Sequence, residues 1–188
     1  MYKTSRKLLK KLKAKRFRKP LIFLFLGIVL ILFGGINYYK IRVLSFTKSP
    51  QESFSEQKSE LPVQITIPSV GIDLPVETGE IKDGVWKISY SSATFLNSSA
   101  RPGNSGNTVI YGHNKKAIFG NLPYLSLGQK IYVKTVDGKI YIYEAYWKDF
   151  VASDRVDLVE ETDKEELTLY TCWGIFDQNR AVIKARPI

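Results

Sequence analysis

The sequence predicts a mostly β domain, a closed barrel or a sandwich, preceded by one apolar N-terminal helix. Two observations carry the β prediction: short runs in which apolar and polar residues alternate, and turns rich in Gly, Pro and Asn between them. A third observation, the uncharged run 20–36, predicts the helix. Many short strands joined by such turns are typical of barrels and sandwiches. At 188 residues the chain has room for one ordinary globular domain with appendages.

The predicted strands begin near residue 61. The run 63–67 alternates and ends at Pro68, and residues 71–76 follow as a second short strand. Two Asp-Gly pairs, at 83–84 and 137–138, are hairpin turn signals. The second pair joins two long alternating runs, and further strands and short helices complete the prediction: strands at 130–136, 139–147, 109–112, 167–172 and 181–185, and short helices near 115–125 and 154–161.

Positive charge is concentrated at the N-terminus. The net charge is +10, but residues 1–19 hold ten Lys and Arg and no acidic residue, so the other 18 basic residues balance the 18 acidic ones. This distribution argues against a nucleic-acid partner. As a helix, the run 20–36 would span roughly 25 Å, close to a bilayer core of roughly 30 Å. Residues 20–39 are therefore predicted to form a transmembrane helix, and a secretory signal peptide is the alternative.

The charge distribution also predicts an orientation. The positive-inside rule places the basic tail 1–19 in the cytoplasm and the rest of the chain outside the cell. Residues 40–60 are predicted as an extracellular linker because 45–60 is rich in Ser, Lys, Glu and Gln. The folded domain should then cover 61–188, on a protein that crosses the cell membrane once.

The chain has one cysteine and one histidine, and both follow strand-like runs. Cys172 ends the run that begins at Leu167, His113 follows 109–112, and Arg180 opens the last apolar run. A thiol can act as a nucleophile, an imidazole as a general acid and base, and a guanidinium as an electrostatic clamp. By residue frequency alone, however, a lone cysteine is more often a buried small apolar residue.

Several motifs resemble those of the sortase family, in the family's order, over about residues 61–188. Residues 168–172 look like the TLxTC signature, 107–113 resemble the strand that ends in Gly-His, and Arg180 matches the third catalytic position. Other matches are 67–76, the loop from Pro102-Gly103 to Gly106-Asn107, and Phe119 with Leu122, Leu125 and Gly128. The signature is most similar to that of class D or E members.

The resemblance implies an eight-stranded β-barrel and a cysteine transpeptidase anchored in the membrane by its N-terminal helix. Its catalytic residues would be His113, Cys172 and Arg180. Thr171 would support the oxyanion, and Trp173 and Asn114 are further candidates for substrate binding. The implied substrate is a surface protein with an LPxTG-like C-terminal sorting signal, and the implied acceptor is an amine of the cell envelope, such as a cell-wall precursor.

Two other functions remain open from the sequence. A hydrolytic cysteine protease would give the acyl group to water, and a catalytically silent barrel would only bind peptides at the membrane. No cofactor and no metal site is predicted, since the acidic residues between 160 and 166 are more typical of a solvated loop.

Overall fold

The structure is a computed structural model that describes residues 23–36, 60–82 and 85–188. The chain divides into two units, 1–42 and 43–188. In the first unit, residues 23–36 form a helix. None of the helices in the described stretches is both long and apolar enough to cross a membrane. The tail 1–19, the ends of the predicted helix 20–39 and nearly all of the predicted linker 40–60 lie outside the described residues.

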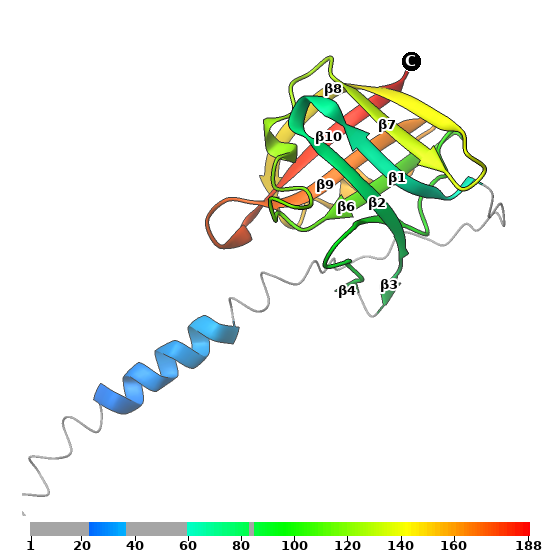
Figure 1. The fold of residues 1–188 in the computed structure, drawn as a ribbon. Helices are drawn as coiled ribbons and strands as arrows, with labels where there is room; N and C mark the ends of the chain where they lie inside the picture. Colours follow the sequence, from blue (N-terminus) through cyan, green and yellow to red (C-terminus); the bar gives the residue numbers. More distant parts are fainter. Residues whose placement is uncertain (1–22, 37–59, 83–84) are drawn as a thin grey trace, which may run out of the picture. The chain divides into compact units, whose positions relative to one another are not determined.

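Eight strands of the second unit close into a barrel, as predicted (Figure 1). Around the barrel they lie in the order β1-β2-β5-β6-β9-β10-β8-β7. Two shorter strands, β3 (Ile81–Lys82) and β4 (Val85–Trp86), pair outside the barrel. The barrel strands are β1 (Pro62–Ile67), β2 (Ile72–Gly79), β5 (Ala93–Leu96), β6 (Asn107–Gly112), β7 (Lys130–Thr135), β8 (Ile140–Ala152), β9 (Glu166–Trp173) and β10 (Asn179–Pro187).

Most predicted strands appear within a few residues of their predicted bounds. The hairpin between β7 and β8 turns at Gly138, whose φ of 84° explains the glycine of the Asp-Gly pair. The other pair, at 83–84, lies outside the described residues, although the strands on either side of it do pair. In the described part of the second unit, the helices are short 3-10 turns: η2 (Pro68–Val70), η3 (Leu122–Tyr124), η4 (Val156–Val159) and η5 (Ile175–Asp177).

The sequence did not predict β5. Its four residues, Ala93–Leu96, are all buried, so they show none of the alternation that marks a half-buried strand. β5 runs parallel to β2 and antiparallel to β6, and it thereby joins the first strands of the barrel to β6.

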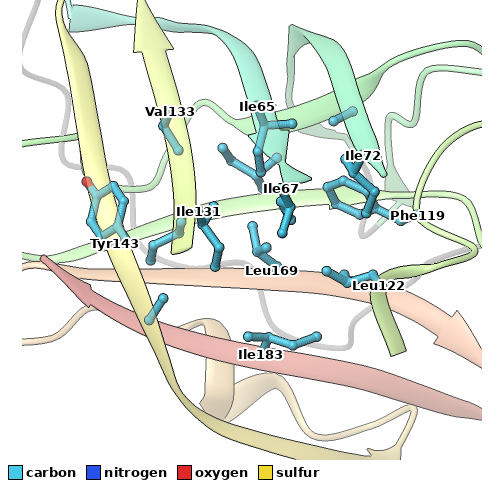
Figure 2. Packing of buried hydrophobic residues seen from close by; sticks show 14 of the residues in the cluster. Ile65, Ile67, Ile72, Phe119, Leu122, Ile131, Val133, Tyr143, Leu169 and Ile183 are labelled. Atoms are coloured by element: carbon cyan, nitrogen blue, oxygen red, sulfur yellow. The ribbon is translucent and has the colours of Figure 1, made fainter. Parts of the chain in front are cut away.

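The barrel interior is filled by aliphatic and aromatic side chains from all eight strands and the loop after β6 (Figure 2). Ile65, Ile131, Leu169 and Ile183 are fully buried there, and Phe119 closes the interior from that loop. This cluster orients the strands that carry the candidate site, because alternate residues of a strand point to opposite faces. On β9, for example, Leu167 and Leu169 belong to the interior cluster.

A second buried cluster lies on the opposite face of β6, β9 and β10. Val109 and Tyr111 come from β6, Tyr170 and Cys172 from β9, and Val182 from β10. Trp86 of β4, Leu96, Val151 and Val159 complete it. Both faces of β6 and β9 are therefore buried, which explains why their sequences are almost continuously apolar or small.

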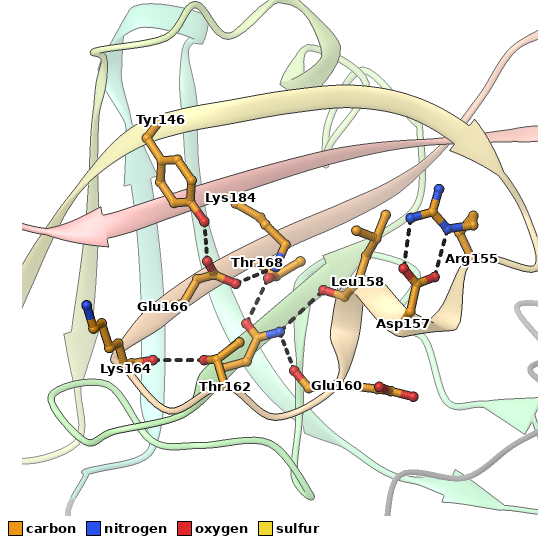
Figure 3. Close-up of polar contacts among 11 residues, drawn as sticks. Tyr146, Arg155, Asp157, Leu158, Glu160, Thr162, Lys164, Glu166, Thr168 and Lys184 are labelled. Atoms are coloured by element: carbon orange, nitrogen blue, oxygen red, sulfur yellow. Dashed lines mark hydrogen bonds and ion pairs between the residues drawn. The ribbon is translucent and has the colours of Figure 1, made fainter.

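Polar contacts fasten the connection between β8 and β9 to the barrel (Figure 3). The Asn107 side-chain amide donates to the carbonyl of Glu160 at 3.0 Å and accepts a hydrogen bond from the Thr168 hydroxyl at 2.7 Å. On β9 the Glu166 carboxylate accepts from Lys184 at 2.5 Å and also from the Tyr146 hydroxyl. These contacts hold β6, β8, β9 and β10 in register at one end of the strands.

Candidate active site

The pairing of three strands brings the predicted catalytic residues to one end of the barrel. β6 and β9 are parallel, with Gly112 opposite Thr171, so His113 and Cys172 each come one residue after this pair. β9 and β10 are antiparallel, with Arg180 directly opposite Cys172. Neighbouring strands lie about 4.8 Å apart. The 59-residue separation between Gly112 and Thr171 is thus closed by a parallel pairing that sequence spacing does not show.

Cys172 and Arg180 are on the same face of their strands. Cys172 belongs to the second buried cluster and is 5% exposed. Arg180 precedes Val182, a member of the same cluster, by two residues, and two-residue spacing returns a side chain to the same face. A guanidinium beside a thiol favours the thiolate, which is the nucleophilic form.

Arg180 is held by main-chain carbonyls. Its Nη1 donates to the carbonyl oxygens of Asp177 at 2.7 Å and Asn179 at 2.9 Å, and the residue is only 3% exposed. A buried cation needs such partners because removal from water is costly. Since η5 supplies one carbonyl and the first residue of β10 the other, the guanidinium orientation depends on the path of the chain from Asp177 to Asn179.

Tyr170 lies on the same face of β9 as Cys172, and both Cys172 and Arg180 affect the pKa of its hydroxyl. Burial raises the pKa of the Tyr170 hydroxyl far above its usual range, the Arg180 charge lowers it, and Cys172 raises it. The phenol therefore stays neutral beside the site. The sequence pattern marked this residue only as the variable position of the signature, and its role depends on strand alternation.

His113 lies against an aromatic ring. The Tyr90 ring stacks on the imidazole, with 5.4 Å between centroids and 28° between planes. Sequence reasoning did not identify Tyr90, which is the one aromatic residue in the run 89–92, and no sequence signal links it to His113.

Asp177 connects the loop that carries His113 to Arg180 of β10. Its Oδ1 accepts a hydrogen bond from the Asn114 side chain at 2.6 Å, and its carbonyl accepts from Arg180. Asp177 and Phe176 both have positive φ, 59° and 57°, a conformation that non-glycine residues adopt at some cost. The sequence did not identify Asp177. Its candidate Asn114 donates its side-chain amide to this carboxylate, and a role of Asn114 in substrate binding stays a prediction.

The other two predicted substrate contacts have different neighbours. The Thr171 hydroxyl donates its proton to the Gly112 carbonyl at 2.9 Å, and the oxyanion role of this residue stays a prediction. Half-buried Trp173 packs on Phe150 at 5.2 Å and edge-on to Tyr124 at 6.2 Å between ring centroids. Within the described residues, no group of three or more His, Cys, Asp and Glu side chains is placed to hold a metal ion.

Fold and site together define a β-barrel protein with a thiol, an imidazole and a guanidinium at adjoining strand ends. The family model described as "Sortase domain" matches residues 65–188. Sortase A of Bacillus anthracis is 31% identical over 134 residues, which cover 70% of this chain and 61% of that protein. The putative sortase YwpE of Bacillus subtilis (strain 168) is 37% identical over 87 residues, 44% of this chain and 84% of that protein. The chain belongs to the sortase family.

Solved sortase structures share the fold. Sortase A from Corynebacterium diphtheriae superposes with a TM-score of 0.58 at 25% identity, over 66% of this chain and 59% of that one. The Clostridium perfringens sortase D5 transpeptidase also has a TM-score of 0.58, at 24% identity, over 66% and 77% of the two chains. Sortases are cysteine transpeptidases.

Proposed function

We propose that this protein is a cysteine transpeptidase in which Cys172 is the nucleophile, His113 the general acid and base, and Arg180 the electrostatic clamp. The observation that supports the proposal most directly is the register of three neighbouring strands. Arg180 is the direct partner of Cys172, and His113 follows the strand that pairs with β9. Each residue type matches its role, because a guanidinium keeps its proton while an imidazole can lose and regain one.

The first half of the reaction forms a thioester. The Cys172 thiolate attacks a peptide carbonyl carbon, the new C–S bond forms, and the C–N bond breaks. The leaving amine takes its proton from the His113 imidazolium. The negative charge that develops on the carbonyl oxygen is stabilised by the Arg180 guanidinium, whose orientation is set by its two carbonyl partners.

The second half releases the product. An acceptor amine attacks the thioester carbon and gives a proton to neutral His113, a new C–N bond forms, and the C–S bond breaks to restore the thiolate. One amide replaces another, so the cycle requires no oxidant, reductant or nucleotide. Water in place of the amine would give hydrolysis through the same thioester.

The proposed substrate is a surface protein with an LPxTG-like sorting signal near its C-terminus, cut between Thr and Gly. The proposed acceptor is an amine of the cell envelope, such as a cell-wall precursor. Both proposals come from family membership and from the sequence motifs around Cys172 and His113.

The test is to incubate the full chain in detergent with an LPxTG-type peptide and a primary amine, and to identify products by mass spectrometry. We expect a peptide–amine product, and an adduct at Cys172 when the amine is omitted. Cys172→Ala should abolish both, and His113→Ala should reduce turnover about as strongly, because residues that act as a unit are not additive.

The same assay separates the alternatives. Unchanged turnover in Cys172→Ala would refute the proposed nucleophile. A hydrolysed peptide with no amine product at any amine concentration would identify a protease. Binding of the peptide without an adduct or product would identify a peptide-binding barrel.

We also propose that residues 20–39 anchor the protein in the cell membrane, with the tail 1–19 in the cytoplasm and the barrel outside. The supporting observations are the uncharged run 20–36 and the ten basic residues before it. Protease added to intact cells should digest the barrel and leave the tail protected. Recovery of the barrel in the medium, cleaved from the apolar run, would instead identify a signal peptide.

A further inference from the structure

Tyr90 is an exposed aromatic residue with a defined partner. Tyr90 is 79% exposed, yet its ring stacks on the His113 imidazole, with 5.4 Å between centroids and 28° between planes. These values are within the range of offset aromatic stacks. Burial of apolar surface explains little of this position, because most of the tyrosine remains in water.

The turn that carries Tyr90 is attached to the barrel at two paired residues. The Ser89 N–H donates to the Thr94 hydroxyl at 3.0 Å, and the Ser89 hydroxyl donates to the Glu77 carboxylate at 3.1 Å. Glu77 and Thr94 are partners in the β2–β5 pairing. The Ser92 N–H donates to the Ser89 hydroxyl at 3.2 Å and closes the turn around the tyrosine. The barrel framework therefore holds the ring in place.

The chemistry of the pair favours one protonation state of the histidine. The face of a tyrosine ring is electron-rich and attracts cations, and imidazole becomes a cation when it binds a second proton. A ring fixed against one face of the imidazole also restricts rotation of the histidine side chain. Stabilisation of the imidazolium and restricted rotation would both help His113 to hold a proton and give it to the leaving amine.

We propose that Tyr90 is a positioning residue for His113: its ring holds the imidazole in place and stabilises the imidazolium that protonates the leaving amine. This inference rests on the proposed function for its catalytic meaning, although the contact itself can be tested without turnover. Other titratable and charged groups on the elements around the imidazole include Lys115 and Lys116 on its own loop, Glu77 beside the turn of Tyr90, and Cys172, Asp177 and Arg180.

These groups act with different signs. Asp177, bound to Asn114, favours the imidazolium, as does a Cys172 thiolate. Arg180 opposes it, and so does Lys115, whose Nζ lies 5.2 Å from the centre of the Tyr90 ring. All of these groups remain when Tyr90 is replaced, so a comparison of Tyr90 variants isolates the contribution of the ring.

The experiment uses the chain's single histidine. In the full chain labelled with ¹³C-histidine, one NMR signal reports the protonation of His113. We expect Tyr90→Ala to lower the pH midpoint by about half a unit, the size of an exposed cation–π contact. Tyr90→Phe should keep most of the wild-type midpoint because the ring remains, and Tyr146→Ala, which removes a part-exposed tyrosine from β8, should not change it.

Kinetics provide the second readout. With the LPxTG-type peptide, Tyr90→Ala should reduce kcat severalfold with little change in KM. The profile of kcat against pH should shift to lower pH over its acidic and neutral range. Tyr90→Phe should restore both properties. A His113 midpoint that is the same in folded Tyr90→Ala and wild type would overturn the inference even if Cys172-dependent turnover were normal. A midpoint shift in a protein without transpeptidation would instead support the contact and refute the proposed function.

Discussion

Thr171→Val tests whether one hydrogen bond sets the distance between the proposed nucleophile and the proposed base. The Thr171 hydroxyl donates to the Gly112 carbonyl at 2.9 Å, and both residues immediately precede the catalytic candidates, Cys172 and His113. Valine has nearly the same shape as threonine but no donor. The variant therefore keeps the packing and removes only this bond.

The expected loss of stability follows from burial. Thr171 is fully buried, so water cannot replace the lost donor. Removing one partner of a buried hydrogen bond costs about 1–3 kcal/mol, and a loss of about 1.5 kcal/mol would lower the Tm of a barrel of this size by about 5 °C. Urea unfolding followed by tryptophan fluorescence measures the change, and Thr171→Ser, which keeps the hydroxyl, should retain the bond.

The matched control lies on the same strand. Thr168 is also fully buried and its hydroxyl donates to Asn107 at 2.7 Å, across the same pair of strands but three residues before Thr171 (Figure 3). Thr168→Val should lose about as much stability. It should leave the strand ends near Cys172 unchanged.

Activity distinguishes the two variants. Small displacements of reacting groups can reduce rates by up to about 100-fold, so we expect Thr171→Val to lower kcat/KM by about tenfold and Thr168→Val by less than about twofold. Both are assayed with the LPxTG-type peptide at a temperature where each variant is folded. Equal activity losses in the two variants, or a Thr171→Val protein as stable as wild type, would refute this reasoning.

Two further predictions concern the aromatic residues. Trp86→Ala should lower the free energy of unfolding by about 3 kcal/mol. Trp86 is buried edge-on against Tyr111, with ring centroids 4.7 Å apart, and is stacked on Tyr170. If urea unfolding shows a decrease below about 1 kcal/mol, the second buried cluster does not depend on Trp86. Burial, and then a hydrogen bond to the Glu166 carboxylate, raise the pKa of Tyr146 from 10.0 to about 12, so the folded state favours the neutral phenol. The resulting contribution to the free energy of unfolding should be present below pH 10 and lost between about pH 10 and 12. Across this range the free energy of unfolding should change less with pH in Tyr146→Phe than in wild type. An identical pH dependence in the two proteins would contradict the raised pKa of Tyr146.

Much of the barrel is predictable because its strands carry local signals. The hairpin of β7 and β8 combines alternation with an Asp-Gly turn, and the structure places Gly138 at a positive φ there. β5 was missed since four residues buried on both faces show no alternation, and its parallel pairing with β2 is a contact between distant parts of the chain. The sequence pattern of a strand indicates how its own residues are buried, but it does not predict which strands pair with it.

The same division applies to the site. Residue types and motifs were sufficient to select His113, Cys172 and Arg180. Tyr90 and Asp177 were not found, because each acts through a contact with a residue on another element, and their own sequence surroundings resemble ordinary loops. Asn114 was a sequence candidate for substrate binding, and its hydrogen bond to the Asp177 carboxylate is visible only in the structure.

By itself, the sequence determined which chemical groups this protein has and the approximate positions of most strands, since both depend on residue identity and local periodicity. Only the tertiary structure decided that the ends of β6, β9 and β10 adjoin and that the face of Cys172 is buried under a second cluster. The physical reason is that parallel pairing is a long-range contact, stabilised by a core that forms from all eight strands together.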